Sequence, residues 1–207
     1  MNFIGSYMKT VLMSLTQCIQ RKQTEAKGGW PMFVKKDEIA IKEIINYDNF
    51  SVECAYFKSN PETIYETAKR KKCVIMIPYK GEKIVMVDEY RISVRKWLLQ
   101  LPAGKIEAFE TAEGAAKREL YEETGFSFCD IKYLGSFYSS PHFSDEEIFV
   151  FAGEVQGGEN SNQTPRERIN VKLICKSEVE NMISSNKLKD AKTITAYLMW
   201  RNSKWKK

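Results

Sequence analysis

Three glutamates follow one another at helical spacing in the segment 104–126, directly after an arginine. At about 100° per residue, Glu119, Glu122 and Glu123 fall on one side of a helix, where they continue a stripe of three alanines. Because alanines can pack closely against a sheet, the carboxylates are expected to face inward or into a cleft. Clustered carboxylate oxygens suit a hard divalent cation such as Mg²⁺. The spacing therefore predicts a metal site on a single helix.

The charge balance of this helix supports a metal site over an ordinary solvated face. Like charges three and four residues apart destabilise a helix by about 0.2–0.5 kcal/mol per pair, and partial burial adds to the cost. Arg118 supplies one compensating charge, and a bound divalent ion would complete the balance. The entry through 101–104 and the closing Gly125 also indicate an organised site.

The helix that carries the glutamates is expected from Thr111 to Thr124, with Gly125 at the position that a helix C-cap favours. A hairpin is expected around 79–82, where the apolar runs 73–77 and 84–87 meet. Strands around a central helix, with helices late in the chain, predict an α+β or α/β sandwich. The other expected strands are 97–101, 131–138, 148–155 and 169–175, and the late helices are 177–184 and 191–200.

The region before this domain divides into two parts. Residues 1–36 show no regular period and are interpreted as a poorly specified N-terminal extension. Alternating apolar residues in 39–57 predict two strands around the turn 46–49, which would form a small N-terminal β subdomain over 37–68. The main domain is placed at 69–207.

Composition limits the classes of protein. The 207 residues suffice for one main domain with an appendage, no run of 18 apolar residues could span a bilayer, and the start of the chain matches a secretory signal poorly. Five cysteines without CxxC spacing argue against a disulfide framework or a zinc site, so the cytoplasm is the default compartment. The net charge of +5 is dispersed, which favours a solvated or anion-attracting surface over nucleic-acid binding.

The segment 104–126 resembles the box of the Nudix family, GX5EX7REUXEEXGU, where U is a bulky aliphatic or aromatic residue. Every required position is met, and weaker similarity extends over most of 37–200. The matching residues are Gly104, Glu110, Arg118, Glu119, Leu120, Glu122, Glu123, Gly125 and Phe126.

The resemblance implies an α/β/α sandwich in which the box forms a loop, a helix and a loop. It implies that Glu119, Glu122 and Glu123 bind Mg²⁺ or Mn²⁺, that Arg118 orients them and that Glu110 is a structural support. The surroundings resemble the ADP-ribose pyrophosphatase branch, in which the carbonyl before the box glycine, here that of Ala103, is a further metal ligand.

Five features around the box carry the resemblance to that branch. Tyr90-Arg91 follows the second core strand, and Pro102-Ala103-Gly104 enters the box. Pro141 stands sixteen residues beyond Gly125, and with Ser140 and Glu146 it looks like the loop that contacts the terminal ribose. Glu167 aligns with an acidic position used as a metal ligand or a base, and 189–193 looks like the entry to the branch's final helix.

Two departures bear on the substrate. Gln100 stands where many relatives have glutamate, which would weaken a structural ion pair. His142 replaces the glycine that usually follows the proline, which would reshape the terminal-ribose pocket.

The activity that the resemblance implies is hydrolysis of a nucleoside diphosphate derivative, with ADP-ribose favoured and AMP and ribose 5-phosphate as products. The alternatives are another nucleoside diphosphate sugar or dinucleotide, or a non-catalytic ligand-sensing or RNA-associated module. Metal ions would neutralise the diphosphate oxygens and activate a water, with Arg91 or Arg95 as auxiliary clamps.

Several roles stay open between residues. Glu167 is the favoured base, against a solvent-exposed loop glutamate, and Glu146 could serve instead. The lone His142 is more often a polar contact than an acid or base. Adenine could stack on an aromatic side chain, and the candidates are Tyr90, Phe137, Phe143 and Trp30.

The resemblance also implies a homodimer that forms through 37–68.

Overall fold

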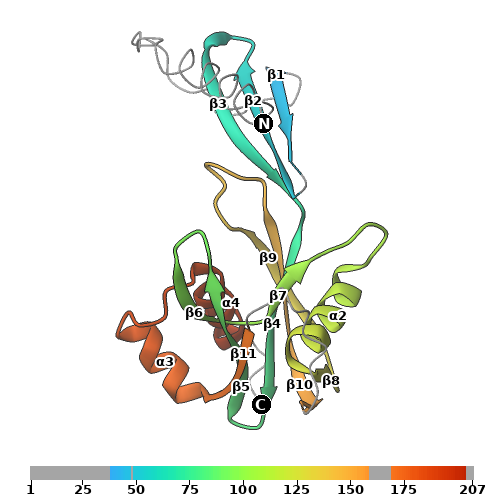
Figure 1. Cartoon of the computed structure of the whole chain (residues 1–207), viewed down its shortest axis with the longest axis vertical. Helices are drawn as coiled ribbons and strands as arrows, with labels where there is room; N and C mark the ends of the chain where they lie inside the picture. Colours follow the sequence, from blue (N-terminus) through green and yellow to red (C-terminus); the bar gives the residue numbers. More distant parts are fainter. Residues whose placement is uncertain (1–37, 48, 159–168, 204–207) are drawn as a thin grey trace, which may run out of the picture. The chain divides into compact units, whose positions relative to one another are not determined.

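The structure is a computed structural model that describes residues 38–47, 49–158 and 169–203 (Figure 1). Glu167 and Trp30, which the sequence offers as a base and as a contact for adenine, lie outside the described residues. None of the described helices is both long and apolar enough to cross a membrane.

An antiparallel sheet of three strands begins the described chain, in the order β1 (Ile39–Asn46), β2 (Phe50–Phe57) and β3 (Asn60–Arg70). The two strands expected around 46–49 are confirmed, and the amide of Tyr47 donates to the carbonyl of Phe50 across the turn at 2.9 Å. The sequence did not indicate β3, because its residues are mostly polar and lack an apolar alternation. Backbone pairing with β2 makes it a strand.

A mixed sheet forms the centre of the main domain. Its order is β11-β5-β4-β10-β8, while β6, β7 and β9 pair with β5, β4 and β10 respectively. The expected hairpin and the four other expected strands are confirmed, and the three-residue strands β7 and β8 are additional. The bounds are β4 (Cys73–Lys80), β5 (Lys83–Arg91), β6 (Lys96–Gln100), β7 (Ala103–Lys105), β8 (Phe126–Phe128), β9 (Lys132–Tyr138), β10 (Glu147–Gly157) and β11 (Ile169–Cys175).

Both faces of this sheet are covered, as the nearly continuous apolar run in β4 requires. Val74 and Met76 point to the face where helix α2 (Ala112–Thr124) packs through its alanines and Leu120. Ile75 and Ile77 point to the other face, which α3 (Lys176–Ser184) and α4 (Ala191–Asn202) cover. Figure 1 shows these helices on opposite sides of the sheet. The expected α/β/α sandwich of the α+β class is therefore confirmed.

Helix α2 begins and ends at residues that the sequence marks. The hydroxyl oxygen of Thr111 accepts from the amide of Gly114 at 3.0 Å, which caps the N-terminus. Gly125 ends the helix with φ 71°, a left-handed conformation that glycine adopts without a side-chain clash. These two caps fix which turn of the helix each glutamate occupies.

Candidate active site

The three glutamates of α2 differ in burial, because they lie at different angles to the sheet. Ala115, Ala116 and Leu120 are fully buried and hold the helix against the sheet. Glu123, on the same side, is 7% exposed, and the side chains of Glu119 and Glu122 are 16% and 47% exposed. Lys117 and Tyr121 are exposed on the opposite side, as the helical spacing predicts. The carboxylates therefore form a row that runs from the core toward solvent.

Two of these carboxylates meet the same short piece of backbone. Glu123 accepts a hydrogen bond from the amide of Ala103 at 3.2 Å. The carboxylate of Glu119 lies over Gly104 so closely that a Cβ on this glycine would stand 1.9 Å from the carboxylate carbon. Gly104 is therefore required by the close approach of a side chain, since its φ is not in the left-handed region. Side chains from successive turns of α2 converge on Ala103–Gly104 of β7.

We expect Gly104→Ala to reduce activity strongly while the chain stays folded. The atoms in the way belong to the end of a flexible side chain, so Glu119 can swing aside at little cost to stability, but its carboxylate then leaves its place. Loss of one ligand position corresponds to about a hundredfold lower kcat/KM. Enzyme kinetics and thermal unfolding on the same preparation check this. Gly81→Ala is the control for lost stability without lost activity, because it strains a left-handed residue (φ 58°) in the β4–β5 turn and touches no glutamate of the site. Unchanged kinetics in Gly104→Ala would contradict it.

Arg118 ties the row together. Its Nε and Nη2 atoms donate to the two carboxylate oxygens of Glu110, both at 2.8 Å, and Nη2 also donates to the carbonyl of Lys105 at 3.0 Å. Its Nη1 lies 2.9 Å from Glu119 Oε1 and 3.1 Å from Glu122 Oε2. One guanidinium therefore joins the loop before the helix to two of the three glutamates. That Arg118 orients metal ligands stays a prediction from the resemblance.

The contact between Arg118 and Glu110 shifts the pKa values of both side chains. The hydrogen bonds from Arg118, followed by the amide of Glu107, lower the pKa of Glu110 to about 2. The same contact with Glu110 is the largest of the effects that raise the pKa of Arg118. Both partners are therefore charged across the physiological range, as two parallel charge-assisted hydrogen bonds require.

The donors present fit an oxygen-preferring divalent ion. Among the described residues, no three His, Cys, Asp or Glu side chains converge on one point, because Arg118 and Ala103 hold the glutamates in separate contacts. The same helix nevertheless brings three carboxylates to one side, and two of them lie against the half-buried backbone of Ala103–Gly104 in β7. Carboxylate and carbonyl oxygens are the ligands that Mg²⁺ and Mn²⁺ take in proteins.

Tyr90 and Arg91 lie at the end of β5, where the sequence places a substrate contact. Arg91 forms an ion pair with Glu89 at 2.9 Å and donates to Gln100 Oε1 at 3.1 and 3.3 Å. Gln100, only 2% exposed, donates to the other oxygen of Glu89 at 2.7 Å. Glu89 gives Arg91 a charged partner, and the amide of Gln100 bridges the two side chains. The expected weakening of an ion pair by Gln100 stays a prediction.

The loop between β9 and β10 contains the other predicted substrate contacts. Pro141 and His142 are exposed, and His142 Nδ1 lies 3.4 Å from the hydroxyl of Ser140. Glu146 is half-buried, and Nε of Arg70 lies 3.3 Å from its Oε1 atom. Sequence reasoning did not find this partner, because Arg70 and Glu146 lie far apart in the chain and only the fold brings them together.

Comparison with known proteins identifies the family. The profile of the NUDIX domain matches residues 69–197, which include the whole row of glutamates and Arg118. The chain belongs to the Nudix family. It is 30% identical over 166 residues to an ADP-ribose pyrophosphatase of Bacillus subtilis, a match that covers 79% of this chain and 88% of the relative.

Two further relatives and one solved structure are similar to this chain. An ADP-ribose pyrophosphatase of Escherichia coli K12 is 27% identical over 81% of this chain and 89% of its own length. A methanol dehydrogenase activator of Bacillus methanolicus is 32% identical over 63% of this chain and 72% of its own length. The crystal structure of an ADP compounds hydrolase superposes with a TM-score of 0.67 at 19% identity, covering 79% of this chain and 92% of that one, so it shares the fold.

The basic run Lys69–Lys72 of this Nudix protein is engaged within the chain. Each of its four side chains forms an ion pair, and the partners come from β2, from the box loop, from the β9–β10 loop and from the start of β10. The run therefore forms ion pairs with each of these segments, and its positive charges are not an unpaired stripe on the surface. The pairs are Lys69 with Glu53 and Asp145, Arg70 with Glu146, Lys71 with Glu107 and Lys72 with Glu147.

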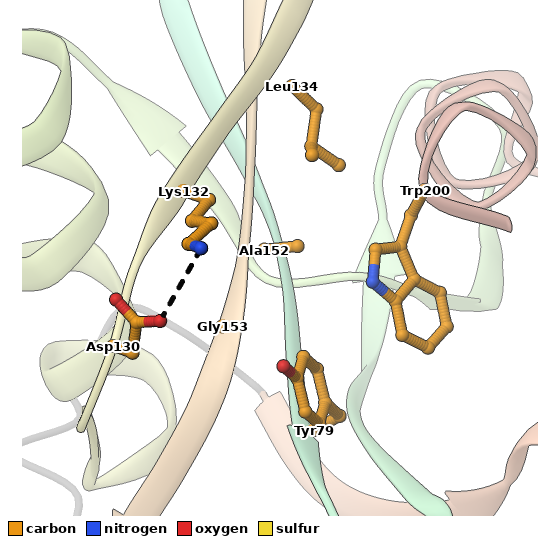
Figure 2. Close-up of a pocket in the computed structure, with 7 residues that line it drawn as sticks. All are labelled: Tyr79, Asp130, Lys132, Leu134, Ala152, Gly153 and Trp200. Carbon is orange, nitrogen blue, oxygen red and sulfur yellow. Dashed lines mark ion pairs between the residues drawn. The ribbon is translucent and has the colours of Figure 1, made fainter. Parts of the chain in front are cut away.

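A small pocket opens away from the Nudix box, at the other end of β4 (Figure 2). Tyr79 stacks on Trp200 with ring centroids 5.5 Å apart, and the ammonium of Lys176 lies 5.6 Å from both rings. Asp130 and Lys132 stand at its other side, 4.0 Å apart. None of the residues lining this pocket is a predicted site residue, so the substrate is expected at the glutamates and not here.

Proposed function

We propose that this Nudix protein hydrolyses the diphosphate bridge of a nucleoside diphosphate derivative, with ADP-ribose as the favoured substrate. The observation that carries the proposal is the convergence of Glu119 and Glu123 on Ala103–Gly104, with Arg118 holding the row. The names of the Bacillus subtilis and Escherichia coli relatives support ADP-ribose among the possible diphosphates. Attack of water on one phosphorus breaks a bond to the bridging oxygen and gives AMP and ribose 5-phosphate.

The residues that would hold the metal are Glu119, Glu122, Glu123, Glu167 and the carbonyl of Ala103. Bound Mg²⁺, or Mn²⁺ in its place, supplies charge that neutralises the phosphoryl oxygens and lowers the pKa of a water molecule. Glu123 and Ala103 keep each other in position through their hydrogen bond, and Arg118 does the same for Glu119 and Glu122. These contacts limit the positions that the three glutamates of α2 can take before substrate arrives.

The remaining site residues receive roles in binding and proton transfer. Arg91, positioned by Glu89 and Gln100, is the proposed phosphate clamp. Glu146, Pro141 and His142 would contact the terminal ribose, and Tyr90 would stack on a base or sugar. We propose Glu167 as the general base. Glu146 is less suited to that role, because the ion pair with Arg70 engages its carboxylate.

The function is tested with a panel of diphosphates in Mg²⁺, with products separated by chromatography and kcat/KM compared. ADP-ribose is expected to give the highest kcat/KM and to yield AMP and ribose 5-phosphate, and a chelator is expected to stop the reaction. If another nucleoside diphosphate sugar or a dinucleotide gives a higher kcat/KM, that compound would replace ADP-ribose as the proposed substrate. Binding of ADP-ribose without turnover of any diphosphate would replace catalysis by ligand sensing.

We further propose a homodimer that forms through the N-terminal sheet. Ile39, Ile41 and Ile44 of β1 share one face with Tyr65 of β3 across β2, and each is 36–55% exposed. An apolar face of this kind on a small sheet is typical of a protein contact surface. A second copy of the same chain is the partner that the family resemblance implies.

Ile41→Asp is expected to convert the dimer to a monomer, because it places a charge in the middle of the proposed contact surface. A desolvated, unpaired charge at an interface costs several kcal/mol, so the dissociation constant of the dimer should rise by about a hundredfold or more. Light scattering at micromolar concentration measures this, with Ile92→Asp in the exposed β5–β6 turn as the control. The proposed interface would be contradicted if the wild type is a monomer, or if Ile41→Asp is still a dimer.

We also propose a cytoplasmic location. Among the described cysteines, Cys129 and Cys175 are exposed free thiols. Exposed free thiols suit a reducing compartment.

A further inference from the structure

The three residues that lead into the Nudix box, Leu101 to Ala103, are held by a different element at each position. The amide of Leu101 donates to the hydroxyl oxygen of Thr193 at 2.9 Å. The carbonyl of Pro102 accepts from the amide of Met76 in β4 at 3.0 Å, and the amide of Ala103 donates to Glu123. Hydrogen bonds to helix α4, strand β4 and helix α2 therefore hold this segment in position.

The hydroxyl of Thr193 in α4 accepts from Leu101 because its own hydrogen is donated elsewhere. Thr193 has no exposed surface, and its hydroxyl donates to Asp190 Oδ2 at 2.8 Å, so an oxygen lone pair is left for Leu101. The same carboxylate oxygen accepts from the amide of Thr193 at 2.9 Å and caps α4. Lys192 lies 2.9 Å from the other oxygen.

The charge on Asp190 keeps this direction fixed. Burial alone would raise the pKa of Asp190, but the charge of Lys192 and the bonds from Thr193 outweigh it and lower the pKa. The carboxylate is therefore an acceptor at neutral pH, and the Thr193 hydroxyl can only donate to it. A buried network in which every member has a partner holds one arrangement.

We propose that Thr193, oriented by Asp190, is a positioning residue for the metal ligands, an inference that rests on the proposed function. Thr193 acts through Leu101 on Ala103 and Gly104, which carry the proposed carbonyl ligand and receive Glu123 and Glu119. Metal–ligand distances are held within about 0.2 Å, and Mg²⁺ demands a nearly ideal octahedron. A small shift of 101–104 would therefore disturb three ligands at once.

The test compares variants that remove or keep the hydroxyl. Thr193→Val keeps the shape of the side chain without the oxygen, and Thr193→Ser keeps the oxygen. Tyr197→Phe is the matched control, since it removes a hydroxyl one turn along α4 whose hydrogen bonds go to Lys176 and Glu180. The readout is the Kd for Mn²⁺ alone, measured by electron paramagnetic resonance, followed by kcat and KM for ADP-ribose.

Thr193→Val is expected to weaken Mn²⁺ binding by about 10- to 100-fold, the usual effect of removing a group that orients metal ligands. Thr193→Ser is expected to restore most of the affinity, and Tyr197→Phe to match the wild type. In the kinetics, kcat should fall more than KM changes, because Arg91, the proposed phosphate contact, keeps its ion pair with Glu89. If Thr193→Val does not fold, Asp190→Asn, which keeps an acceptor oxygen but loses the charge, should show a smaller loss of the same kind.

Three results would overturn the inference. They are wild-type Mn²⁺ affinity in folded Thr193→Val, equal losses in Thr193→Ser and Thr193→Val, and an equal loss in Tyr197→Phe. Failure of the proposed function is a separate result, because Mn²⁺ binding is measured without substrate. A wild type that binds Mn²⁺ yet leaves ADP-ribose intact would reject the substrate and keep the positioning role, while a wild type that binds no Mn²⁺ would reject both.

Discussion

Replacing Glu123 with glutamine is expected to lower kcat/KM for the proposed substrate ADP-ribose by about a thousandfold while the protein stays folded. A metal ion contributes several kcal/mol of charge stabilisation in the transition state, and each 1.4 kcal/mol is a factor of about ten. Glutamine keeps an oxygen that can accept the 3.2 Å hydrogen bond from the amide of Ala103, while the ligand charge is lost.

The control for this variant lies on the same helix. Glu113 is paired with Lys117 on the exposed face, and both side chains are 54% exposed, so Glu113→Gln should leave kcat/KM unchanged. Circular dichroism and thermal unfolding show whether each variant is folded. Full activity in Glu123→Gln would mean that the carboxylates of α2 do not bind the catalytic metal, and the proposed function would lose its main support.

Arg118→Met is expected to reduce both stability and activity. It leaves Glu110, Glu119 and Glu122 without their shared cation and the carbonyl of Lys105 without a donor. Removing one partner of a buried pair costs about 3–5 kcal/mol, and an exposed pair contributes about 1 kcal/mol or less. Since Arg118 is 32% exposed, we expect the free energy of unfolding to fall by about 2 kcal/mol. Loss of orientation should lower kcat/KM by about 10- to 100-fold.

The stability effect of Arg118→Met should depend on pH. In the folded protein the pKa of Glu110 is about 2, below its ordinary value of 4.5, because Arg118 and then the amide of Glu107 stabilise the carboxylate. A lowered pKa stabilises the fold fully above about pH 4.5 and ceases to do so as the pH falls toward 2. The difference between wild type and Arg118→Met should therefore shrink over this range in urea unfolding.

The neighbouring Lys117→Met is the matched control for Arg118→Met. It also removes one positive charge from α2, but the ion pair that it breaks is exposed on both sides. Its free energy of unfolding should stay within about 0.5 kcal/mol of the wild type. Equal losses in Lys117→Met and Arg118→Met would show that net charge, and not the guanidinium network, explains the effect.

The sequence by itself determined the helix and the side on which its glutamates lie. Both follow from local geometry, since residues three and four apart share a face and Thr111 and Gly125 mark the ends. Most core strands were also predictable, because a buried strand needs an apolar run whatever its neighbours are. Strand β3 was not, since its polar residues become a strand only through pairing with β2.

Only the tertiary structure decided the partners of the site residues. The place of Glu119 over Gly104, the pair of Arg70 with Glu146 and the support of Leu101 by Thr193 join residues that are 15 to 92 positions apart. Spacing along the chain records which residues share a face of one element. It does not record which element packs against that face, because that depends on how the whole core is filled.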